Sequence, residues 1–110
     1  MTSSLPEFLV IIPDFANVSP ETRAEARPIH LREVQPLVDA KVVVKGGALL
    51  SPISQPGEAP AVNGSVMIVQ IENADAVRQR LENDVYHKKA IWDLDKAQII
   101  LIKCGFRTPL

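Results

Sequence analysis

The sequence predicts a small α+β domain whose elements follow the order β-α-β-β-α-β. Four short apolar runs, rich in branched residues, stand beside two longer segments whose apolar residues recur at steps of three and four. The 110 residues fit one domain over 1–110, with a core of about residues 8–106. Apolar residues make up 46% of the chain, which is enough for a buried core.

The first half of the chain is expected to form a strand followed by a long helix. Residues 8–12 form a β-branched run that predicts a buried strand. The helix is expected over residues 21 to about 40, where apolar residues have helical spacing and Pro20 suits the first position. Pro28 and Pro36 lie inside this helix. Because each removes a backbone donor, we expect a kink or a frayed end.

The second half completes the sheet. We expect a strand at 41–50, a loop at 51–64, a strand at 65–72, a helix at 74–83, a short helical stretch at 84–91 and a strand at 97–103. Gly46 and Gly47 in the second strand predict a bulge or a close backbone approach. The loop is long enough to serve as a lid or a pocket rim. This order predicts the ferredoxin-like fold, a four-stranded antiparallel sheet with both helices on one face.

The composition of the strands predicts a homodimer. The first, third and fourth strands are apolar at nearly every position, as in strands that are buried on both faces. Two helices can cover only one face of the sheet, and a large exposed apolar patch is rare on monomers. We therefore expect two copies to pack through their open sheet faces. The alternative is that the loop at 51–64 folds over that face.

The composition also excludes several classes of partner. A formal net charge of -1 and five aromatic residues do not provide the basic surface and the stacking platforms typical of nucleic-acid binding. No apolar run is long enough for a membrane span, and the N-terminus has no secretory pattern, so we expect a cytoplasmic location without nucleic acid or membrane as a partner. The single cysteine, Cys104, cannot form an internal disulfide, which suits a reducing compartment.

No motif for a cofactor or a metal ion is present, and we expect neither. His30 and His87 are the only histidines, and no His-x-x-x-His or Glu-x-x-His pattern surrounds them. The segment Lys45-Gly46-Gly47 lacks the spacing of a phosphate-binding or dinucleotide-binding loop. A Gly-x-Ser-x-Gly nucleophile motif is also absent from the sequence.

His30 and Asp84 are the candidate catalytic residues. His30 lies on the apolar stripe of the first helix, so its imidazole should point toward the sheet and could act as a general acid or base. Asp84 follows the inner stripe of the second helix and could orient that imidazole. The alternative for His30 is a histidine that is merely buried in the core. Asp84 could instead cap the next helical stretch, or do both, with one carboxylate oxygen at the cap and the other toward the pocket.

Three further residues are candidates for binding a substrate. Arg27 precedes His30 by three positions and could bind a carboxylate or an enolate, although a solvated helix residue is the alternative. Tyr86 and Trp92 could line a pocket. Packing in the core or at an interface is the alternative for both rings.

A family resemblance rests on several short segments. They are Arg27-Pro28-Ile29-His30-Leu31, Gly46-Gly47, Pro56-Gly57, Gly64-Ser65 and Asp84-Val85-Tyr86. With these, the chain resembles the YciI-like (YCII-related) proteins of the dimeric α+β barrel superfamily from about residue 8 to 106. The resemblance implies that His30 and Asp84 face one another in a pocket at the end of the sheet. The chain departs from the family pattern at Val85, where a proline is common, and at 88–90, where a glycine often occurs.

These features together predict an enzyme that needs no cofactor. We expect an elimination, an isomerisation or a lactone hydrolysis on a small aromatic, phenolic or polyketide-like molecule. His30 would move the proton, Asp84 would orient the imidazole of His30, and Arg27 would stabilise negative charge. The alternatives are a non-catalytic dimer that binds a metabolite or acts as a scaffold, and a cofactor-free barrel of the monooxygenase type.

Overall fold

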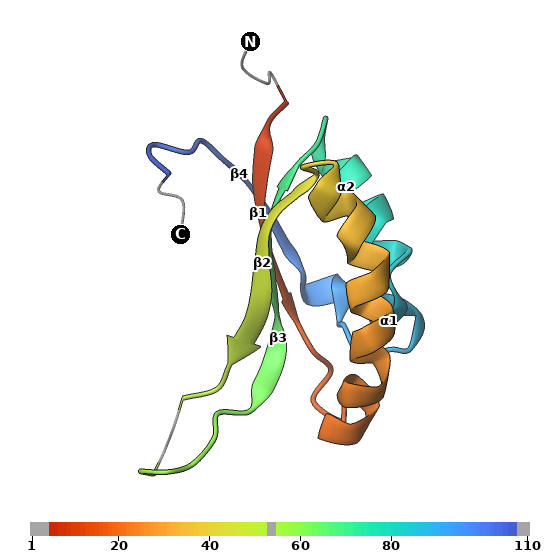
Figure 1. Ribbon diagram of the computed structural model, residues 1–110, viewed down its shortest axis with the longest axis vertical. Coiled ribbons are helices and arrows are strands. Elements are labelled where there is room, and N and C mark those ends of the chain that lie inside the picture. The colour runs from red at the N-terminus through yellow and green to blue at the C-terminus, as the bar shows by residue number, and fades with distance from the viewer. Residues whose placement is uncertain (1–4, 53–54, 108–110) are drawn as a thin grey trace.

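The computed structural model describes residues 5–52 and 55–107 and shows a sheet covered by helices on one side (Figure 1). The strands are β1 (Glu7–Pro13), β2 (Val43–Leu50), β3 (Val62–Gln70) and β4 (Gln98–Ile102), and the helices are α1 (Pro20–Asp39), α2 (Ala74–Glu82), the short α3 (Val85–Lys88) and the 3-10 turn η1 (Leu94–Lys96). All neighbouring strands are antiparallel, in the order β2-β3-β1-β4. The predicted α+β fold class is confirmed.

The longest helix, α1, is continuous although two prolines lie inside it. Ser19 caps its first turn, and the amide of Ala40 closes its last turn by donating to the carbonyl of Pro36 at 3.0 Å. The expected frayed end is therefore wrong. Pro28 and Pro36 are both exposed, so water can reach the carbonyls that lose their helical donors.

The expected bulge in β2 lies at a different place. Gly46 and Gly47 pair regularly with residues of β3, whereas the register shifts between Val43 and Lys45. The strand also begins at Val43 rather than at residue 41, because Lys41 has a φ of 61 and lies in the turn after α1. The remaining boundaries differ from the expected ones by at most about three residues, the start of β3 included.

The loop between β2 and β3 is shorter than expected. β3 begins at Val62, which pairs with Leu50, so the loop covers residues 51–61 rather than 51–64. Its described residues do not line the cavity between α1 and the sheet that is described below. Residues 55–61 extend past the ends of β2 and β3 instead of lying over the sheet (Figure 1). The expected pocket rim or lid is therefore wrong for the part of the loop that the structure describes.

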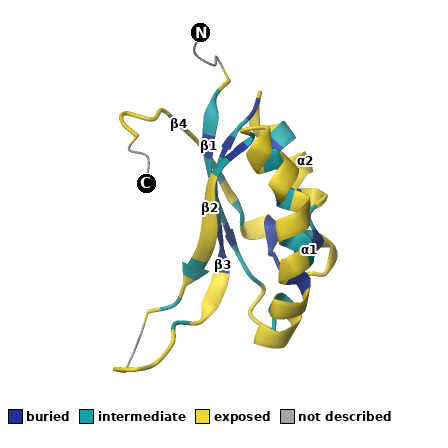
Figure 2. Ribbon diagram, in the orientation of Figure 1, coloured by how far each residue is buried: buried dark blue, intermediate teal, exposed yellow. Residues whose placement is uncertain are grey.

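The two faces of the sheet have different environments. Along β1, Phe8, Val10 and Ile12 are buried beneath the helices, whereas the residues between them are only partly buried. The open face carries apolar side chains from three strands: Leu9, Ile11, Val66, Ile68 and Ile100. Figure 2 shows burial concentrated between the layers. Over residues 5–52 and 55–107, no helix combines the length and the apolarity that a membrane crossing needs.

Candidate active site

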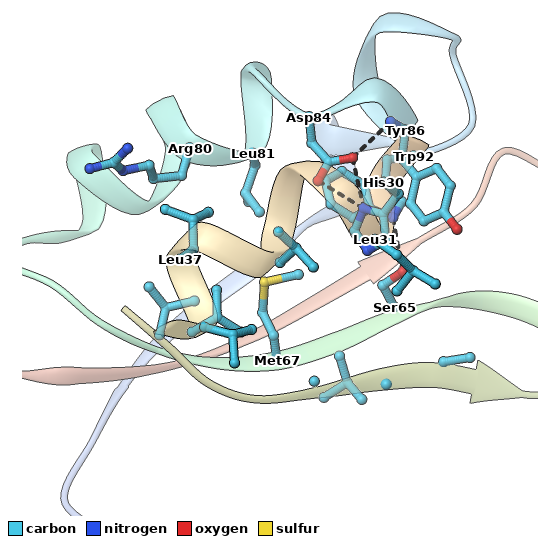
Figure 3. A pocket seen from close by; sticks show the side chains of 18 of the residues that line it. His30, Leu31, Leu37, Ser65, Met67, Arg80, Leu81, Asp84, Tyr86 and Trp92 are labelled. Atoms are coloured by element: carbon cyan, nitrogen blue, oxygen red, sulfur yellow. Dashed lines mark hydrogen bonds and ion pairs between the residues drawn. The ribbon is translucent and has the colours of Figure 1, made fainter. Parts of the chain in front are cut away.

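A cavity of about 380 Å³ opens between α1 and the sheet (Figure 3). Its aliphatic part is lined by residues of α1, α2, β2 and β3, among them Leu37, Val43, Met67, Val77 and Leu81. Its polar part gathers side chains that could carry chemistry: Arg23, Arg27, His30, Ser65, Asp84, Tyr86 and Trp92. An apolar pocket with a few converging polar groups is the usual form of a small-molecule site.

The structure brings His30 and Asp84 into contact. The Nδ1 atom of His30 lies 2.9 Å from Oδ2 and 3.0 Å from Oδ1 of Asp84 (Figure 3). Asp84 also caps α3, since its Oδ1 accepts a hydrogen bond from the Tyr86 amide at 2.9 Å. One carboxylate therefore serves both purposes considered from the sequence. The Nε2 atom of His30 has no partner among the described residues, and His30 lines the cavity.

Two aromatic rings fix the plane of the His30 imidazole. The ring of Tyr86 stacks on it with centroids 4.1 Å apart and an interplanar angle of 11°. Trp92 meets it edge-on at 5.9 Å and 80°. Tyr86 and Trp92 therefore belong to the core and to the cavity wall at the same time. With Nδ1 bound to Asp84, the imidazole is constrained in both direction and plane.

Arg23 also belongs to this cluster, and sequence reasoning missed it. Its Nε donates to Asp14 at 2.8 Å, one terminal nitrogen donates to the hydroxyl of Tyr86 at 3.3 Å, and the other donates to Gly64 and Ser65 at 3.1 and 3.0 Å. Its guanidinium carbon lies 4.6 Å from the centre of the Tyr86 ring. The signal was available, because residues seven positions apart share a helix face and Arg23 precedes the histidine by seven.

Arg27 differs from Arg23 in its contacts. It is exposed, lines the cavity, and makes no hydrogen bond or ion pair with the residues that the structure describes. A guanidinium in this position can meet an anionic group on a ligand without first breaking another contact.

The hydroxyl of Tyr86 stays protonated at neutral pH. Burial raises the pKa of Tyr86 above its ordinary value of 10.0, and the nearby charges of Arg23 and Arg27 oppose that rise. Tyr86 therefore offers a neutral ring face to the imidazole. In the described part of the chain, no three His, Cys, Asp or Glu side chains lie close enough together to hold a metal ion.

The chain is similar to several proteins that are named for biosynthesis. No family model matches it. "Fusaric acid biosynthesis protein 2" from Gibberella fujikuroi is 33% identical over 99 residues, which cover 90% of this chain and 94% of that protein. The chain belongs to the family of this protein. A similar segment, 34% identical over 99 residues, occurs in "Aspartate kinase FUB3" from Fusarium oxysporum f. sp. lycopersici, of which the chain spans 18% of the length.

Similarity to a solved structure also supports the fold. It is "5-chloro-2-hydroxyhydroquinone dehydrochlorinase (TftG) from Burkholderia phenoliruptrix AC1100" in complex with 2,5-dihydroxybenzoquinone. The two folds superpose with a TM-score of 0.67 and 25% sequence identity, over 90% of this chain and 93% of the other. The chain therefore shares the fold of this dehydrochlorinase, the α+β fold of the dimeric α+β barrel type.

Proposed function

We propose that this chain is an enzyme of secondary metabolism that performs acid–base chemistry on an aromatic or polyketide-like metabolite. The observation that carries the proposal is the contact of His30 Nδ1 with both oxygens of Asp84, at the polar end of an otherwise apolar cavity. A biosynthetic relative and a structural neighbour that holds a dihydroxybenzoquinone support a small-molecule substrate. The relation to the YciI-like proteins is part of the same proposal.

The pair has the geometry that general base catalysis needs. A carboxylate that accepts the Nδ1 proton holds neutral imidazole in the tautomer whose Nε2 carries the lone pair. Nε2 of His30 then removes a proton from the ligand, and the bonding electrons move to a leaving group in an elimination or to a neighbouring atom in an isomerisation. In a lactone hydrolysis, Nε2 takes the proton from the attacking water instead. Asp84 stabilises the imidazolium that forms, and Arg27 faces the negative charge that develops on the ligand.

We also propose that the enzyme is a homodimer built through the open sheet face. The apolar side chains on that face are partly buried or, at Ile100, exposed within one chain, and no described segment covers them. A large apolar face of this kind is typical of an interface between copies.

The experiment is a turnover screen of chlorinated hydroquinones, phenols and aromatic lactones, with three variants. His30→Gln should lower the rate by about 10²-fold or more, which is the usual contribution of general acid–base catalysis. Asp84→Asn should lower the rate as well, and it should move the His30 proton toward Nε2 in nitrogen NMR spectra. His87→Gln is the matched control and should keep the parent rate, because His87 does not line the cavity.

The outcomes separate catalysis from binding alone. If ligands bind to the parent chain but none is turned over, the chain is a binding module and the catalytic proposal is wrong. If a substrate is found and His30→Gln converts it at the parent rate, the chemistry does not depend on this imidazole.

A further inference from the structure

The hydroxyl group of Ser65 occupies an unusual position beside His30. Ser65 lies in β3 on the face that looks toward the helices, lines the cavity, and is only 5% exposed (Figure 3). Its Oγ accepts a hydrogen bond from Trp92 Nε1 at 3.0 Å and another from a terminal nitrogen of Arg23 at 3.0 Å. Both partners are donors only, so the direction of each bond is fixed by chemistry.

These two bonds leave the proton of Ser65 without a partner. A hydroxyl group offers two lone pairs and one proton, and here both lone pairs are engaged. Among the residues that the structure describes, none accepts the remaining proton. A buried donor without an acceptor is costly, and Ser65 lines the cavity, where a ligand could supply the acceptor.

We propose that Ser65 donates this proton to an acceptor oxygen of the ligand. The inference rests on the proposed function and specifies its substrate class: the ligand carries a carbonyl, phenolate or enolate oxygen close to the atom on which His30 acts. The guanidinium that binds Ser65 is charged, and hydrogen bonds in a chain polarise one another, so the hydroxyl becomes a stronger donor. Such a donor stabilises negative charge that develops on the oxygen.

Arg23 and Trp92 are positioning residues in this arrangement. The donors of Arg23 are directed at Asp14, Tyr86, Gly64 and Ser65, which fixes its guanidinium in the wall of the cavity. The indole of Trp92 has a single donor, and Ser65 receives it. Neither residue needs to touch the ligand, because each acts by fixing where the hydroxyl proton points.

The test compares two flat probes of similar shape by isothermal titration and by NMR. One is 2,5-dihydroxybenzoquinone, which presents oxygens on opposite sides of its ring, and the other is p-xylene, which has no acceptor. Ser65→Ala should weaken binding of the quinone by about 10-fold and leave binding of p-xylene unchanged. Ser51→Ala is the matched control, since Ser51 is outside the cavity, and it should bind both probes like the parent.

A second variant guards against misfolding. Ser65→Ala removes the acceptor for two buried donors and could fail to fold, whereas Ser65→Cys keeps a weak acceptor and a weak donor. Ser65→Cys should also weaken binding of the quinone, but by less than Ser65→Ala does, and it should leave binding of p-xylene unchanged. If the parent does not bind the quinone, if neither variant weakens its binding, or if both probes weaken equally, the inference is wrong.

The measurement also separates this inference from the function on which it rests. Probe binding needs no turnover. If the chain binds the quinone through Ser65 but has no activity, this inference stands and the catalytic proposal is wrong. Conversely, the chain could be active while Ser65→Ala keeps the parent kcat/KM and the parent affinity. In that case the catalytic proposal stands and this inference is wrong.

Discussion

The imidazole of His30 lies parallel to the phenol ring of Tyr86, with the ring centroids 4.1 Å apart and the planes inclined by 11°. Tyr86 follows Asp84 by two positions, and its amide donates to the same carboxylate that binds Nδ1 of the histidine. One short segment, residues 84–86, therefore sets both the direction and the plane of the imidazole. Helix α1 places His30 next to this segment.

Substitution of Tyr86 separates the ring from its hydroxyl group. Tyr86→Phe keeps the stacked ring and loses only the 3.3 Å bond from Arg23, so turnover should stay within a few-fold of the parent. Tyr86→Leu removes the stack, which is worth about 0.5–1.5 kcal/mol in aromatic pairs, and should lower turnover by up to about 10-fold. Rates from the substrate screen and thermal unfolding of both variants check this. Equal rates for the two variants would show that stacking does not position His30.

The raised pKa of Tyr86 makes stability depend on alkaline pH. Burial favours the protonated phenol in the folded chain, so the unfolded chain loses its proton first as the pH rises above 10.0. The folded chain then holds more protons than the unfolded one, and the free energy of unfolding falls with pH in that window. Below it, this contribution is fully present.

The single tyrosine makes this effect directly measurable. In the folded parent chain, the midpoint of the phenolate absorbance change should lie at a pH above the ordinary pKa of tyrosine. In denaturant, the midpoint should lie at the ordinary value. Urea unfolding on either side of pH 10.0 should show a smaller alkaline loss of stability in Tyr86→Phe than in the parent. An absorbance transition at or below the ordinary value in the folded chain would contradict burial as the dominant cause.

The periodicity of the sequence predicted more of this site than its motifs did. Helical spacing predicted that His30 faces the sheet, and the same spacing would have included Arg23 two turns earlier. The role of Ser65 could not be predicted, because it depends on Arg23 and Trp92 arriving from distant parts of the chain. Periodicity assigns each residue to a face, whereas a hydrogen bond between faces depends on tertiary packing.

Gly64 is another residue whose tertiary contacts the sequence could not predict. A glycine in a strand predicts a bulge or a close backbone approach, but the sequence does not say which glycine has the near neighbour. A Cβ at Gly64 would lie 2.5 Å from the carbonyl oxygen of Ile12 and 3.1 Å from the Cα of Pro13. A Cβ at Gly46 would make only ordinary contacts of 3.7 Å or more. The close approach lies in β3 rather than in β2.

Alanine substitutions at these two glycines should therefore differ. Gly64→Ala forces β1 and β3 apart where Arg23 binds the carbonyl of residue 64, and should cost about 1–3 kcal/mol of unfolding free energy. Gly46→Ala meets no obstacle and should be neutral or stabilising by up to about 1 kcal/mol. Urea unfolding of both variants measures the difference. Equal stabilities would show that β1 and β3 can separate locally without cost.

A charge at the centre of the open sheet face tests the homodimer. Leu9 lies on β1 between Ile68 of β3 and Ile100 of β4, so it is at the middle of the apolar face. Leu9→Lys can keep its charge in water in an isolated chain, but would bury the charge without a partner in the dimer. The dimer dissociation constant should rise by about 100-fold or more, measured by sedimentation over a range of concentrations. Circular dichroism should show that the variant is folded.

The control adds the same charge on the helical side of the molecule. Gln79→Lys lies on the exposed part of α2, away from the open sheet face, and should dimerise like the parent. A parent chain that stays monomeric at every concentration contradicts the homodimer, and a Leu9→Lys variant that dimerises with the parent affinity places the interface elsewhere. If instead only Leu9→Lys becomes monomeric, its turnover shows whether the cavity works within one chain. The cavity residues His30 and Asp84 lie on the other side of the sheet, so we expect the folded monomer to keep most of its activity.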